Sequence, residues 1–260
     1  MDPIFVFFDI GGAVLLAWWL YKTLAPTHHL YRHWRWRSVV LIALAVSIAL
    51  IYYVLRRWAS YDVVDNPYYI IGYLALGLLW ISGATKLSTA LADIRFQQDV
   101  RDRNNAAAAL AIGGLLVGNA AAYAGANVGD GPGFHVVSFS ALLSLSAVCG
   151  SVWVLAAFSD GEERITVDHD FGAALRLAAL AVAVGIIAGR GAAGDWVSIE
   201  ATVRDFAVVG WPILPMIGAA IVNERASPPG YAEASPLRSV GFAAIFIALA
   251  VAYVSGLEAP

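Results

Sequence analysis

Five polar or charged side chains fall inside long apolar stretches of the chain, where contact with lipid would be costly: Asp9, Asn119, Ser144, Arg176 and Asp205. Side chains of these types at such positions often line the path of an ion or a solute. We therefore interpret them as a candidate polar pathway. Three alternatives stay open: an interhelical hydrogen bond for Asn119, a packing role for the serine stripe that includes Ser144, and extension of Arg176 to the inner surface.

The chain carries no motif of a familiar catalytic type. It lacks a glycine-rich phosphate loop, a His-Glu-x-x-His pair and a serine in a nucleophile elbow. Its lone cysteine, Cys149, excludes a cysteine-based metal site. His28, His29 and His33 cluster in a basic connection rather than on facing apolar helices. We expect no enzymatic activity, no catalytic or metal-binding residues and no bound cofactor.

A face of small residues lies in the middle of the chain. Gly114, Gly118 and Ala122 recur at four-residue intervals and so share one side of a helix. Small residues at this spacing let two helices approach closely in lipid. The pattern predicts a helix-packing surface, which also permits self-association.

The composition indicates an integral membrane protein. Hydrophobic residues make up 60% of the 260 residues, charged residues make up 13%, and the mean hydropathy is +0.71. A spanning helix needs roughly 17–25 apolar residues. Eight stretches are long enough, and they cover 4–21, 38–55, 68–88, 106–125, 134–158, 171–188, 201–222 and 239–256. The predicted fold is all-α and polytopic, with eight transmembrane helices.

The eight stretches form four pairs, and these pairs indicate an internal repeat. The run DRNNAAAALAIGGLLVG begins at Asp102, and DHDFGAALRLAALAVAVG begins 66 residues later at Asp168. Because each pair begins and ends on one side of the membrane, the pairs would be parallel repeats. We expect a single integral membrane domain over 1–260, with two-helix repeats at about 1–58, 59–126, 127–191 and 192–260.

Basic residues concentrate in alternate connections, which the positive-inside rule assigns to the cytoplasm. Both termini are then predicted on the non-cytoplasmic side. Six arginines of these connections are candidates for contact with anionic lipid headgroups or a protein partner: Arg32, Arg35, Arg37, Arg95, Arg101 and Arg103. We also expect the third span to continue beyond the membrane as an exposed helix over 95–103, supported by Arg–Asp pairs four residues apart.

The fourth stretch carries an Asn-x-Ala-Ala opening followed by a Gly-Gly-x-x-x-Gly run, formed by Asn104, Asn105, Ala107, Ala108, Gly113, Gly114 and Gly118. In these motifs residues from about 68 to 191 resemble the bacterial inner-membrane family known as domain of unknown function 350 (YjfL-like proteins). The second copy departs from the pattern, since Phe171 replaces the asparagine. The resemblance implies a multi-pass protein of the bacterial inner membrane and brings no established activity.

Three functions remain open on these observations. The first is transport or channel-like conduction along a pathway where the repeats meet. The second is a non-transporting scaffold that recruits a cytosolic partner through 95–103 and the basic connection at 28–37. The third is a haem-bearing electron carrier. We expect membrane lipids as partners, with a homo-oligomer or a cytosolic protein as further candidates, and no nucleic acid.

Overall fold

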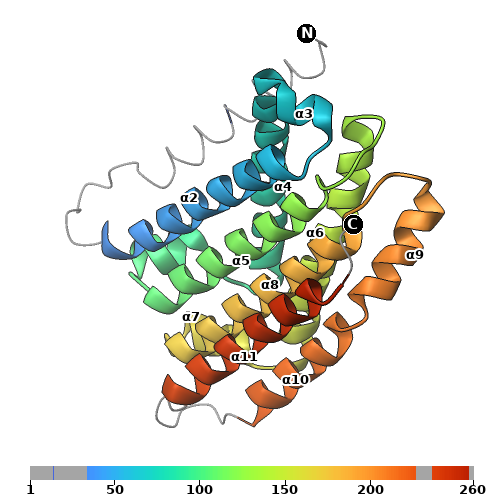
Figure 1. The fold of residues 1–260 in the computed structure, drawn as a ribbon. Helices are drawn as coiled ribbons and strands as arrows, with labels where there is room; N and C mark the ends of the chain where they lie inside the picture. The colour runs from blue at the N-terminus through green and yellow to red at the C-terminus, as the bar shows by residue number, and fades with distance from the viewer. Residues whose placement is uncertain (1–13, 15–33, 227–235, 258–260) are drawn as a thin grey trace.

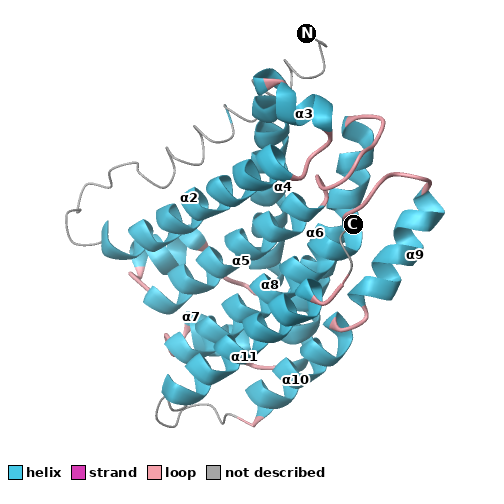
Figure 2. Ribbon diagram, viewed as in Figure 1, coloured by secondary structure: helices cyan, strands magenta, loops and turns pink. Residues whose placement is uncertain are grey.

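The computed structural model describes residues 14, 34–226 and 236–257, which form helices joined by short loops (Figure 1). Within these ranges no β-strand is formed, and a single backbone bridge joins Ala59 to Gly129 (Figure 2). The all-helical prediction is therefore confirmed for the described chain.

The helices follow one another as α2 Trp34–Arg57, α3 Tyr61–Asp65, α4 Pro67–Leu91, the π-helical turn η1 Phe96–Asp102, α5 Ala106–Gly125, α6 Phe134–Phe158, α7 Gly161–Thr166, α8 Phe171–Ala192, α9 Ile199–Gly210, α10 Ile213–Arg225 and α11 Pro236–Ser255. Six of them, α2, α4, α5, α6, α8 and α11, are long and apolar enough to cross a membrane. These six coincide with six of the predicted spans, and the multi-pass membrane character follows from them.

The seventh predicted span, 201–222, is not one straight helix. It is divided into α9 and α10, whose axes differ by 43°. The break falls at Trp211 and Pro212, because proline has no backbone N–H and its ring clashes with the carbonyl four residues earlier. The first predicted span, 4–21, lies outside the described residues except for residue 14. The described chain thus has six helices that are long and apolar enough to span a membrane, or seven if α9 and α10 count as one.

Side-chain caps begin three of the long helices. The side chain of Asn66 accepts a hydrogen bond from the Tyr68 amide at 3.0 Å, with Pro67 at the first helical position. Asn105 accepts from the Ala108 amide at 3.1 Å. At the start of α8 the carboxylate of Asp170 accepts two backbone amides. These caps satisfy donors that would otherwise be left unpaired in lipid.

Helices α5 and α8 form the centre of the bundle and touch backbone to backbone. A Cβ atom added to Gly114 would lie 2.2 Å from the Cβ of Ala178, and one added to Gly118 would lie 2.4 Å from the Ala181 carbonyl oxygen. Ala122 meets Gly189 in the same contact. The partners advance together along both helices, so the two run parallel. We call this contact the small-residue seam.

The remaining spans pack around the two central helices. Helix α2 packs against α5, and α11 packs against α8, so that α2, α5, α8 and α11 follow one another across the bundle (Figure 1). Helices α4 and α6 pack against each other; α4 also packs against α5, and α6 packs against both α5 and α8. Tyr123 of α5 fits under Gly77 of α4, where a Cβ would lie 2.5 Å from its ring.

The predicted exposed helix over 95–103 is wrong. Helix α4 ends at Leu91, the chain turns at Asp93 with φ 43°, and the turn η1 then folds back against α5. Asp99 and Val100 are buried in this contact. The cause is local, because the Asp99 carboxylate accepts a hydrogen bond from the Arg95 backbone amide at 2.7 Å and so closes the turn.

Candidate functional site

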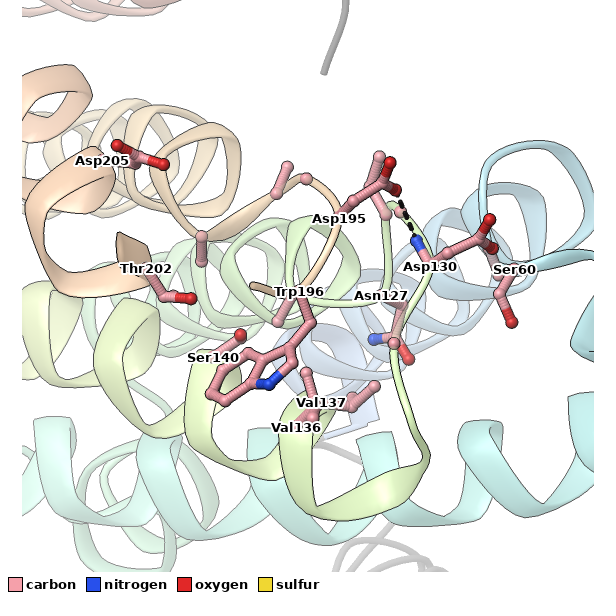
Figure 3. Close-up of a pocket in the computed structure, with 18 of the residues that line it drawn as sticks. Ser60, Asn127, Asp130, Val136, Val137, Ser140, Asp195, Trp196, Thr202 and Asp205 are labelled. Atoms are coloured by element: carbon pink, nitrogen blue, oxygen red, sulfur yellow. Dashed lines mark hydrogen bonds between the residues drawn. The ribbon is translucent and has the colours of Figure 1, made fainter. Parts of the chain in front are cut away.

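A cavity of about 350 Å³ opens at the end of the bundle where α5 and α8 finish. We call it the loop-end cavity. Its roof consists of the α5–α6 and α8–α9 loops, and its sides are formed by α6, α9 and the ends of α2 and α4 (Figure 3). The volume lies in the range typical of sites for small molecules.

Backbone contacts hold the two roof loops together. The Gly194 amide donates to the Val128 carbonyl at 2.9 Å, and the Trp196 amide donates to the Asp130 carbonyl at 2.8 Å. Gly129 has φ 103°, and a Cβ there would lie 2.4 Å from the Gly194 carbonyl carbon. Both the dihedral angle and the close approach require glycine at this position. The roof is therefore a built structure.

The buried part of the cavity is mostly apolar and includes two uncharged polar side chains. Asn127 is 5% exposed, and its Nδ2 donates to the Tyr123 carbonyl at 2.8 Å. Its Oδ1 is buried and has no hydrogen-bond partner. Ser140 of α6, which is also buried, lines the same cavity. An unpaired buried acceptor is costly, so this part of the cavity is suited to a ligand that donates a hydrogen bond.

The mouth of the cavity carries charge. Asp130, Asp195 and Asp205 line it (Figure 3), and the cationic Arg190 is also among the lining residues. Asp195 Oδ1 accepts from the Asp130 amide at 2.8 Å. Asp205 projects from α9 with 61% of its side chain exposed and pairs with Arg204 at 3.3 Å.

A second polar feature lies near the opposite ends of α5 and α8. Arg176 of α8 forms a two-point ion pair with Glu224 of α10, at 2.5 Å from Nε and 2.7 Å from Nη2. Its Nη1 donates to Ser239 of α11 at 2.6 Å. The side chains of Arg176 and Glu224 are 1% and 4% exposed. Three helices distant in sequence are thus joined by one guanidinium.

Arg164 of α7 completes this buried ion network. It donates to Glu224 at 3.2 Å and forms a short contact with the carboxylate of Asp170. Burial raises the pKa of Asp170, but the Ala173 amide and the Arg164 guanidinium outweigh it, and the net pKa is below its ordinary value. The network of two arginines and two carboxylates is electrically balanced, as buried charges need to be.

The two features do not form one site. Arg176 and Arg190 are fourteen residues apart on α8, which corresponds to about 21 Å along the helix. The small-residue seam occupies the space between them. Asp205 reaches the loop-end cavity and Arg176 reaches the ion network, whereas Asp9 lies outside the described residues.

The other two candidate pathway residues join helices within the core. Asn119 donates from Nδ2 to the Thr85 hydroxyl on α4 at 3.1 Å, and its own Oδ1 is buried without a partner. Ser144 of α6 donates to the Ala122 carbonyl of α5 at 3.0 Å. The interhelical interpretation of Asn119 thus has a partner in the structure, and neither residue lines the loop-end cavity.

The six arginines proposed for headgroups or partners occupy different environments. Arg37 is 3% exposed, so it lies inside the described chain rather than on a lipid-facing surface. Arg95 and Arg103 are more open and pair with Asp93 and Asp99. Arg101 donates a hydrogen bond to Gln97 at 3.3 Å. Arg35 is part of helix α2, whereas Arg32 lies outside the described residues.

Sequence reasoning missed Asn127, Arg164 and Glu224. Asn127 and Arg164 stand in loops or short turns outside the predicted spans, so the search for polar groups in apolar stretches passed over them. Glu224 lies just beyond the predicted seventh span. A signal was present nonetheless, because a lone acidic residue at a membrane boundary requires a cationic partner. Among the described residues no cluster of three metal-ligating side chains occurs.

Comparison with known proteins identifies a family. The model for the Domain of Unknown Function (DUF350) matches residues 62–191, which is half of the chain. No curated protein and no solved structure matches. The matched part includes Asn127, Asp170 and Arg176, while Asp205 and Glu224 lie beyond it.

Proposed function

The chain belongs to the family described as Domain of Unknown Function (DUF350), and from this premise we propose that it is a transport protein of the bacterial inner membrane. Its loop-end cavity faces the non-cytoplasmic side and receives a small polar solute. Within the proposed repeat, α4–α5 and α6–α8 are adjacent copies of one two-helix unit.

The single observation that carries this proposal is a polar cavity built against a discontinuous helix. Helix α9 forms one wall through Thr202, Asp205 and Val209, and it ends at the 43° break before α10. Transporters commonly place their solute sites at broken helices, because irregular backbone is tolerated in the membrane only where protein or water satisfies it.

Repeated turns support the arrangement as parallel copies. Asn104 and His169 are 65 residues apart and both have φ 55°. Each precedes a helix cap, and the cap amides of Asn105 and Asp170 donate to the carbonyls of Asp99 and Arg164 at 2.9 and 2.8 Å. If α5 and α8 are each the second helix of a repeat, and the two repeats have the same orientation, then the turns before them should share this unusual dihedral angle.

Movement of one helix to admit a solute requires that its neighbours stay in place, and the ion network holds α7, α8 and α10 together. Glu224 holds α10 to α8 through Arg176 and to α7 through Arg164. Helix α9 takes no part in this ion network and is exposed along much of its length. It packs against α8, where Phe206 lies against Gly191, and the Tyr253 hydroxyl of α11 donates to the Val209 carbonyl at 3.0 Å. We therefore assign the motion that admits solute to α9, with its hinge at Trp211 and Pro212.

The scaffold function takes second place. It was motivated by a projecting helix over 95–103, and that segment folds back onto α5. Arg95 and Arg103 remain the surface that a cytosolic partner would contact.

The test uses cysteines on the two faces of α9. In a Cys149→Ser background, Thr202→Cys places a thiol in the loop-end cavity, and Val203→Cys places one on the exposed face as a matched control. Uptake of ethanolammonium, ethylene glycol and glycolate into proteoliposomes is measured before and after a membrane-impermeant thiol reagent.

We expect uptake of at least one of the three solutes, inhibited by the reagent with Thr202→Cys and unaffected with Val203→Cys. Equal inhibition of both variants would contradict the role of the cavity. A protein that moves none of the three solutes above the rate of empty vesicles would contradict transport.

A further inference from the structure

We infer that the loop-end cavity binds a small organic ammonium ion. This inference rests on the proposed function, since it names the class of solute that the cavity receives. It is drawn from the acceptors that the cavity offers, from the sign of its charge and from its volume.

The deepest acceptor is Asn127. Its amide orientation is determined by the bond from Nδ2 to the Tyr123 carbonyl, which leaves Oδ1 as a buried acceptor with no partner. Figure 3 shows this amide among the cavity side chains, between Trp196 and Asp130 in the view. A water molecule or a hydroxyl could donate one hydrogen bond to Oδ1, but an ammonium group donates with the added strength of its charge.

The charged side chains favour a cation over an anion. Asp130, Asp195 and Asp205 line the cavity against the single guanidinium of Arg190. Asp205 is partly compensated by Arg204, which does not line the cavity. Asp130 and Asp195 come from the two roof loops and are joined through a backbone amide, so both carboxylates stand at the same mouth. Such a mouth attracts cations and repels anions.

Trp196 adds an aromatic surface to the same wall. Its ring lies edge-to-face with Phe139 at 5.9 Å, which holds it in position beside the cavity. The faces of tryptophan rings attract ammonium groups, including methylated ones. Val136 and Val137 line the cavity nearby and can receive a short carbon chain. The site therefore suits an ammonium group on a small organic body better than a bare metal ion.

Binding to purified full-length protein in nanodiscs tests this inference, by calorimetry with ethanolammonium, ethylene glycol and glycolate. The three share a hydroxyl and a two-carbon body, and they differ in carrying a positive, zero or negative charge. We expect ethanolammonium to bind more tightly than ethylene glycol, and glycolate not to bind. Glycolate or ethylene glycol binding as tightly as ethanolammonium would overturn the inference.

Two variants locate the site. Asn127→Leu removes the buried acceptor and should weaken ethanolammonium binding by about 10-fold, as expected for a lost hydrogen bond to a charged group. Asp195→Asn keeps an oxygen for the Asp130 amide while it removes a charge, and it should weaken binding about 3-fold at low salt. If Asn127→Leu does not fold, Asp195→Asn and Asp205→Asn carry the test.

Glu163→Gln is the matched control, because it removes one exposed carboxylate from α7, on the far side of the seam. It should leave the affinity unchanged. The proposed site would be refuted if the cavity variants bound ethanolammonium as tightly as the unchanged protein. It would also be refuted if Glu163→Gln weakened binding as much as the cavity variants do.

Failure of this inference and failure of transport give different results. If the thiol reagent blocks uptake of ethylene glycol or glycolate in the Thr202→Cys variant, the proposal of transport stands and the ammonium site is refuted. Ethanolammonium binding that depends on Asn127, without uptake of any solute, would preserve the site and refute transport.

Discussion

The turns that precede α5 and α8 have the same backbone and opposite buried charges. In both, a residue with φ 55° stands before the helix cap, and the cap amide bonds to a carbonyl six residues earlier. That earlier residue is Asp99 in the first turn and Arg164 in the second. The comparison shows that a backbone can be repeated while the electrostatic role of the matched side chain is reversed.

The surroundings of the two side chains account for the reversal. Asp99 is satisfied locally, by the Arg95 amide and by Arg103, whose side chain is 48% exposed to solvent. Arg164 is satisfied partly by Glu224, sixty residues away on α10, and both are buried. The charge of the first turn is thus satisfied within its own part of the chain, whereas the charge of the second depends on a helix that follows much later.

Removal of one carboxylate charge that stabilises each turn, Asp99 in the first and Glu224 of α10 for the second, gives the largest expected contrast. Glu224→Gln leaves Arg176 and Arg164 buried with a single carboxylate between them, and it should lower the free energy of unfolding by about 3–5 kcal/mol. Asp99→Asn leaves Arg103 in contact with water and should cost about 1 kcal/mol. Denaturant titration in mixed micelles measures both, and equal losses would contradict the comparison.

Removal of both partners of the closest pair should restore much of that loss. The double substitution of Arg176→Met with Glu224→Met replaces a buried ion pair by side chains of similar length, which is often near neutral in protein interiors. Arg164 keeps Asp170 as its partner. We expect the double variant to be more stable than Glu224→Gln by about 2 kcal/mol or more. A double variant no more stable than Glu224→Gln would indicate that the network is required as a whole.

The cap of the second turn should lose its stabilising effect in acid. Because the pKa of Asp170 in the folded chain is below its unfolded value of about 3.9, its contribution to stability is present above that value and is lost as the pH falls through the folded pKa. Asp170→Asn should cost about 1–2 kcal/mol at neutral pH and reduce the acid sensitivity. Unfolding measured at about pH 7 and about pH 3 checks this, and the corresponding cap, Asn105, does not titrate.

The smallest effect is expected for the exposed partner of the first turn. Arg103→Gln removes a half-exposed ion pair, and such pairs contribute about 0–1 kcal/mol. The backbone amide of Arg95 still satisfies Asp99 after this change. A loss above about 2 kcal/mol in the same titration would show that Arg103 has a role beyond the local pair.

Local sequence determined the elements of this protein. Runs of apolar residues predicted six of the spans, and short polar side chains form the caps at Asn66 and Asp170 directly before two of these runs. The four-residue spacing of Gly114 and Gly118 predicted a close helix contact. These features depend on residues within one or two turns of each other, so the order of the chain is enough to reveal them.

Tertiary structure alone decided which faces meet. Arg176 and Glu224 are 48 residues apart, and no local pattern indicates that α10 bends back to join them. The loop-end cavity likewise arises where two loops and a broken helix approach one another. Spacing along a helix determines which side chains share a face, but the partner of that face depends on packing of the whole chain. For that reason Asp205 could be suspected from the sequence, while Asn127, its neighbour in the cavity, could not.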